Sequence, residues 1–230
     1  MEKDVEQAVV RAMDAKITID RLADGLLTRA KETFDIPCKR GCSHCCNQLT
    51  ISHLFEGVVL AKRLIDDRRL ADLNLLQIQG RLQIFMNNSS AGTLAERTRD
   101  TASKWFAKDI PCALLKDHKC TVYDIRPIVC SSYLAIVVDG ANEEDGPPTA
   151  CAPPQAKDVC CVDNLRLIVE AVKLDTNFIK YLVGRTIDHP FLLPLGWMAY
   201  LGATLILQGK REFMVCLEAA LETSYPNMVM

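Results

Sequence analysis

Four of the chain's eleven cysteines lie within nine residues, in the run Cys38-Lys-Arg-Gly-Cys42-Ser-His-Cys45-Cys46. If this run is helical, its cysteines lie at i, i+4, i+7 and i+8 and share one face. Closely spaced thiolates bind zinc or iron–sulfur clusters, because a short bend aims two sulfurs at one centre. Burial of four small apolar side chains is the alternative, but the charged and polar residues between them do not fit it. The run therefore predicts a metal site.

A second group of cysteines follows further along the chain. We predict eight metal ligands in total: Cys38, Cys42, Cys45, Cys46, Cys112, Cys120, Cys130 and Cys151. Cys160 and Cys161 are further candidates, and Cys160 is an alternative to Cys151. Cys216 lies in an amphipathic helical pattern, so we expect it in the core rather than on a metal.

The identity of the metal is left open between an iron–sulfur cluster and zinc, since soft thiolates bind both. The adjacent pair Cys45-Cys46, the scarcity of histidine and the CxxxCxxC spacing favour a 4Fe-4S cluster. Eight thiolates would instead form two closed zinc sites. His44 and His118 neighbour predicted ligands, but loop histidines of this kind are usually solvated. Radical S-adenosylmethionine enzymes use the same three-cysteine spacing, yet no alternation of strands and helices follows here.

The second cysteine group contains the segment Cys120-Thr-Val-Tyr-Asp-Ile-Arg-Pro-Ile-Val-Cys130. Together with the first run, Trp105, Cys112 and Cys151, this segment resembles the cysteine-cluster proteins described as zinc- or iron-chelating and named for a CxxCxxCC signature. The resemblance covers about residues 38–151 and implies a metal-binding core. The family distantly includes flagellin lysine methylases, in which an iron–sulfur cluster is associated with methyl transfer from S-adenosylmethionine.

Within this motif, Arg126 and Tyr123 are candidate cofactor-binding residues. The guanidinium would offset the negative charge of a thiolate-rich centre, and the ring would pack beside it. A salt bridge from Arg126 to Asp124 or Asp109 is the alternative. The chain departs from the family at Ala113, Leu114 and Ser131, where proline, phenylalanine and arginine are common. An activity that depends on that arginine is therefore in question here.

Three functions follow from these features. The first is a metal-binding protein that holds an iron–sulfur cluster or zinc through clustered thiolates. The second is an iron–sulfur enzyme that transfers methyl groups from S-adenosylmethionine to a protein, although no glycine-rich nucleotide loop is visible. The third is a helical interaction domain stapled by zinc, with a protein partner.

Composition and charge exclude other classes. A net charge of −2, with interspersed acidic and basic residues, gives no basic face for nucleic acid. The charged N-terminus lacks the apolar segment of a signal peptide, and an odd number of cysteines does not suit a secreted disulfide scaffold. We therefore expect a cytoplasmic protein. The uncharged residues 191–207 approach the length of a membrane span, but Pro194, Gly196 and Gly202 favour a buried helix.

The hydrophobic pattern predicts a mainly α fold, a single domain over 1–230 that wraps around a metal-binding core at 38–151 and ends in a helical part at 158–230. We expect helices at about 4–34, 52–67, 70–87, 94–108, 163–183, 190–208 and 210–224. Expected caps are Ser52, Asp163, Asp175 and a Thr93–Glu96 capping box, with Gly209 as a stop. Residues 121–123 and 134–138 form at most a small β-hairpin, and 139–157 form a loop. Glu56 is an ordinary helix carboxylate, a partner of the metal ligands or a general base near the metal.

Overall fold

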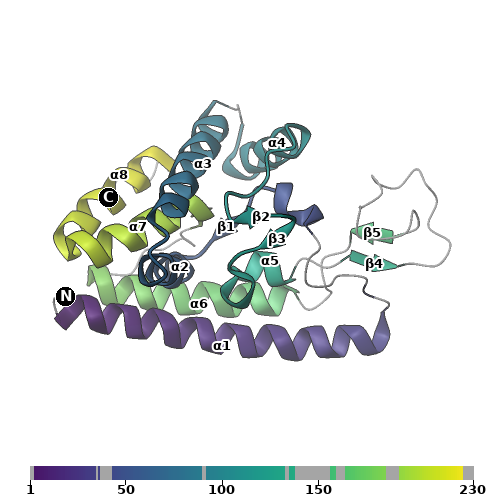
Figure 1. The fold of residues 1–230 in the computed structure, drawn as a ribbon, viewed down its shortest axis with the longest axis horizontal. Coiled ribbons are helices and arrows are strands. Elements are labelled where there is room, and N and C mark those ends of the chain that lie inside the picture. Colours follow the sequence, from purple (N-terminus) through teal and green to yellow (C-terminus); the bar gives the residue numbers. More distant parts are fainter. Residues whose placement is uncertain are drawn as a thin grey trace.

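The computed structural model describes residues 3–34, 36, 43–89, 92–132, 135–137, 156–158, 164–184 and 192–224. This part of the chain is mainly helical, as predicted (Figure 1). Its α-helices are α1 (Lys3–Thr33), α2 (Leu54–Asp66), α3 (Leu70–Asn88), α4 (Leu94–Ala107), α5 (Ile128–Ser132), α6 (Asn164–Val183), α7 (Leu195–Gln208) and α8 (Lys210–Ser224). Two short 3-10 helices, η1 (His44–Asn47) and η2 (Tyr123–Ile125), lie in the cysteine-rich part.

The strands form three antiparallel pairs of two or three residues per strand. They are β1 (Ile51–Ser52) with β6 (Leu193–Pro194), β2 (Leu115–Lys116) with β3 (Lys119–Cys120), and β4 (Ala135–Val137) with β5 (Ala156–Asp158). The strand predicted at 134–138 is confirmed as β4, but it pairs with β5, which begins within the predicted loop 139–157, and not with residues 121–123. Residues 121–123 were wrongly predicted as strand, and the hairpin next to them is β2–β3. Residues 121–123 form a turn and the start of η2, where the N–H of Ile125 donates to the carbonyl of Val122 at 3.0 Å. Such local bonds outweigh a weak β-propensity.

Helices α2 and α7 pack against each other at the centre of the molecule. The long α1 runs beside α6 along one side, while α3 and α8 contact α7 (Figure 1). The apolar run at 191–207 supplies α7, whose Leu195, Met198 and Leu201 are buried. The helix begins later than predicted because Leu193 and Pro194 pair with β1. Across the described residues, no helix combines the length and the apolar character that a membrane crossing requires.

Helix termini confirm some of the predicted caps and correct others. Thr93 and Glu96 form the predicted capping box at the start of α4, and Gly209 ends α7 with a φ of 90°. Ser52 is not a cap, since His53 occupies the N-cap of α2 and the Ser52 hydroxyl donates to Glu56. Asp175 lies within α6 and accepts the backbone N–H of Phe55, so it caps α2 from a neighbouring helix. Asp163 lies outside the described residues.

Candidate metal centre

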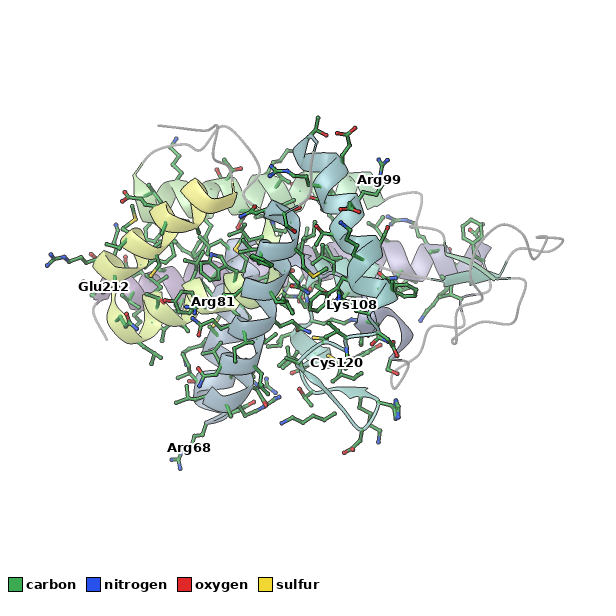
Figure 2. The ribbon with its side chains drawn as sticks, turned by 90° about the horizontal axis from the view of Figure 1, so that it is seen from above. Arg68, Arg81, Arg99, Lys108, Cys120 and Glu212 are labelled. Carbon is green, nitrogen blue, oxygen red and sulfur yellow. The ribbon has the colours of Figure 1, made fainter. Side chains whose placement is uncertain are left out.

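One pocket collects cysteines from four separate segments. Cys46 comes from η1, Cys112 from the chain before β2, Cys120 from β3 and Cys130 from α5. All four are partly buried. Figure 2 shows Cys120 where the β2–β3 hairpin joins the rest of the molecule. Segments that are up to 84 residues apart in sequence (46 to 130) thus meet at one place.

Backbone contacts hold the two cysteine groups together. The N–H of Cys112 donates to the carbonyl of Cys46 at 2.8 Å, which joins the first group directly to the second. On α3, the side chain of Gln79 donates to the carbonyl of Pro111 at 2.8 Å and accepts the N–H of Ala113 at 3.1 Å. These bonds flank Cys112 on both sides and fix its backbone. Sequence reasoning missed Gln79, because a lone glutamine on a helix gives no signal for a partner 34 residues away.

Helix α5 carries Cys130 and is anchored at its N-terminus by Glu56. Oε1 of Glu56 accepts the backbone N–H of Ile128 at 2.6 Å. The sulfur of Cys130 lies 3.9 Å from the Thr50 hydroxyl. Glu56 is therefore more than an ordinary helix carboxylate, since it orients the helix that presents a predicted ligand.

The two predicted cofactor-binding residues also line this pocket. The guanidinium of Arg126 stacks over the ring of Tyr123, with Cζ 4.2 Å from the ring centroid. The carboxylates considered as alternative partners bond elsewhere: Asp124 pairs with Arg63 at 3.2 Å, and Asp109 accepts a hydrogen bond from Asn47. Arg126 is thus placed where its positive charge can offset thiolates. The remaining walls are largely apolar: Leu49, Leu114, Val122, Val129 and Leu195.

The other predicted ligands are not placed in the pocket. Cys38, Cys42 and Cys151 lie outside the described residues, as do Cys160 and Cys161, and the side chains of Cys45 and His44 are not described either. Among the residues that are described, no three or more His, Cys, Asp or Glu side chains form a group that could hold a metal ion. The four cysteines therefore share a pocket without forming a closed ligand cage on their own.

Two further sequence predictions concern residues away from the pocket. Cys216 is half-buried on α8, packs against the core and has its sulfur 3.7 Å from the Tyr200 hydroxyl. It does not line the cysteine pocket, in agreement with its predicted structural role. His118 is exposed in the turn between β2 and β3, as expected for a solvated loop histidine.

Buried ionisable residues connect the pocket to the helical core. Glu56 and Asp175 are 2% exposed, and His53 lies between them with Nδ1 at 3.5 Å from Asp175 Oδ2. Burial raises the pKa of Glu56 and of Asp175. Burial lowers the pKa of His53, but the contact with Asp175 and the charge of Glu56 outweigh it, so the net shift is upward. This cluster joins α2, α5 and α6.

We expect Glu56→Gln to lower the free energy of unfolding by about 2 kcal/mol at pH 5, because an amide nitrogen cannot accept a backbone N–H. The two carboxylate oxygens accept from Ile128 and from His53, so one bond must be lost. The folded-state pKa of Glu56 is raised, so its contribution to stability is present at low pH and falls as the pH rises through that pKa. The loss caused by Glu56→Gln should therefore shrink toward pH 8, as measured by urea denaturation at several pH values.

Glu96→Gln is the matched control for this prediction. Glu96 forms the same capping-box contact at the start of α4, but on the surface. Hydrogen bonds from Thr93 lower its pKa, so the effect of Glu96→Gln should grow as the pH rises from acidic values. The same pH trend in both variants would contradict the assignment of Glu56.

No family model, no curated protein and no solved structure matches this chain. The resemblance to the CxxCxxCC proteins therefore stays a prediction that rests on the cysteine spacing and on the motif around Arg126.

Proposed function

We propose that this protein binds a metal centre through cysteine thiolates, with an iron–sulfur cluster favoured over zinc. The observation that carries the proposal is the single pocket lined by Cys46, Cys112, Cys120 and Cys130. Buried cysteines that only fill a core do not require a cation beside them, whereas a thiolate cluster does. Arg126 lines the same pocket, and this supports the proposal that the cysteines bind a metal.

The donor set fits a thiolate-bound metal. Sulfur ligands surrounded by apolar walls suit zinc and iron–sulfur centres, and the walls limit access of water. The described cysteines do not complete a cage by themselves, so we propose that Cys38, Cys42, Cys45 and Cys151 supply further ligands. In this arrangement, the bond from Cys112 to Cys46 and the bond from Ile128 to Glu56 hold the segments that carry the ligands, and Arg126 offsets the negative charge. A bound cluster would supply redox or Lewis-acid chemistry.

The test is elemental analysis of protein purified without air, together with its visible absorption spectrum. Iron with acid-labile sulfide and a brown colour is the expected result. Colourless protein with about two zinc ions per chain would keep the metal proposal but replace the cluster by closed zinc sites. Protein that holds neither metal, even after anaerobic reconstitution with iron and sulfide or with zinc, would overturn the proposal.

A further inference from the structure

A second cavity lies beside the cysteine pocket, between α3, α4 and the β1–β6 pair. Leu49 lines both spaces, so the two are separated by little more than one side chain. Figure 1 shows α4 alongside α3, above the level of β1. None of the predicted metal ligands that the structure describes lines this cavity.

Gln83 is the most informative residue in the wall of this cavity. The residue as a whole is only 5% exposed and its side chain lines the cavity, yet its amide is not among the fully enclosed polar atoms that lack a partner. A glutamine amide offers two donors and an acceptor. An amide in the wall of a cavity can form hydrogen bonds with a molecule inside it.

Other neutral polar side chains line the same cavity. Thr101 is fully buried and its hydroxyl donates to Oδ1 of Asn87 over a long distance of 3.4 Å. This bond leaves the two N–H donors of the Asn87 amide for another partner. Thr98 adds a second hydroxyl. The polar side of the cavity therefore presents amides and hydroxyls that can both donate and accept.

The remainder of the wall is apolar, and none of the described lining residues carries a charge. Ile51, Ile84 and Leu193 are representative of this apolar part. A charged ligand would be desolvated here without a counter-charge, which is unfavourable. A neutral molecule with a hydrocarbon body and one amide or hydroxyl matches both sides of the cavity.

We propose that this cavity is a binding site for a small uncharged ligand that carries an amide or hydroxyl group on a hydrocarbon body. The amide of Gln83 bonds the polar group, with Asn87 and the two threonines beside it. The apolar wall covers the hydrocarbon part. The position next to the cysteine pocket places such a ligand close to the predicted metal centre, but binding itself requires only the cavity.

The test uses 2-pyrrolidinone as the probe and protein with 13C-labelled isoleucine methyl groups. On titration up to about 100 mM, a range that covers weak fragment affinities, the methyl signals of Ile51 and Ile84 should shift and saturate. Gln83→Leu keeps the size of the side chain and removes the amide, so it should weaken binding at least tenfold. Cyclopentanone has the same ring size without an N–H donor and should bind several-fold more weakly than 2-pyrrolidinone.

Gln77→Leu is the matched control, since Gln77 is half-buried on the same helix and does not line the cavity. It should bind the probe as wild type does. Gln83→Leu should also unfold at an equal or higher temperature, because it places an apolar side chain at a position that is only 5% exposed. Unmoved Ile51 and Ile84 signals, or equal affinity in wild type and Gln83→Leu, would overturn the proposal and mean that the cavity holds only water.

Discussion

Cys120→Ala is expected to yield protein with less than about a tenth of the wild-type metal content, because structural thiolate sites bind cooperatively and lose affinity steeply when one ligand is removed. The variant should also lose several kcal/mol of stability, about 3 or more, since metal binding adds directly to the free energy of folding. Cys120 ends β3, and its pocket joins η1, the hairpin and α5. Elemental analysis and urea denaturation measure the two effects.

Cys216→Ala is the control, because this cysteine is half-buried on α8 and does not line the pocket. It should retain full metal content and lose at most about 1 kcal/mol from the smaller side chain. Cys42→Ala and Cys45→Ala should behave like Cys120→Ala if the first cysteine run supplies ligands. Equal metal content in Cys120→Ala and Cys216→Ala would remove Cys120 from the predicted ligand set.

Periodicity predicted the α-helices other than α5 (Ile128–Ser132), because each of them is encoded by its own residues, whereas α5 is too short to show a period. The apolar spacing in 4–34 and the Thr93–Glu96 capping box determine α1 and α4 without reference to the rest of the chain. The β1–β6 pair could not be predicted in this way. It joins Ile51 to Pro194, and two-residue strands leave no pattern in the sequence.

The candidate site shows the same division between local and long-range information. Cysteine spacing predicted eight metal ligands, and the structure brings four of these cysteines to one pocket. The spacing carried no information on what holds them there. Gln79 and Glu56 do so through bonds to backbone N–H groups 34 and 72 residues away. Asp175 was misassigned for the same reason, because it caps a helix other than its own.

The close packing of α7 against α3 and α2 depends on glycines, and we expect substitution of these glycines to have a large effect on stability. A Cβ on Gly196 would lie 1.8 Å from the carbonyl oxygen of Leu76, and a Cβ on Gly202 would lie 2.7 Å from the carbonyl oxygen of Gly57. These contacts are with backbone atoms of α3 and α2, which cannot rotate away as a side chain can. The small residues that interrupt the apolar run at 191–207 are therefore the ones that let α7 pack at the centre.

Gly196→Ala is expected to lower the free energy of unfolding by about 3 kcal/mol or more, since the added methyl group must push α3 and α7 apart. The same movement should reach the cysteine pocket. Leu195 lines that pocket, and its N–H donates to the carbonyl of Thr50 at 2.9 Å, next to the contact between Thr50 and Cys130. Urea denaturation and metal content measured on one preparation test both effects.

Gly25→Ala provides the matched comparison, because a Cβ at this position of α1 meets no atom within 4 Å. Alanine is the better helix former, so this variant should gain about 0.5–1 kcal/mol. The two substitutions are chemically identical and both lie in helices. Their opposite effects on the free energy of unfolding would therefore isolate the cost of separating α3 and α7. A Gly196→Ala protein as stable as wild type would show that the two helices can move apart freely, and the pocket would then not depend on the position of α7.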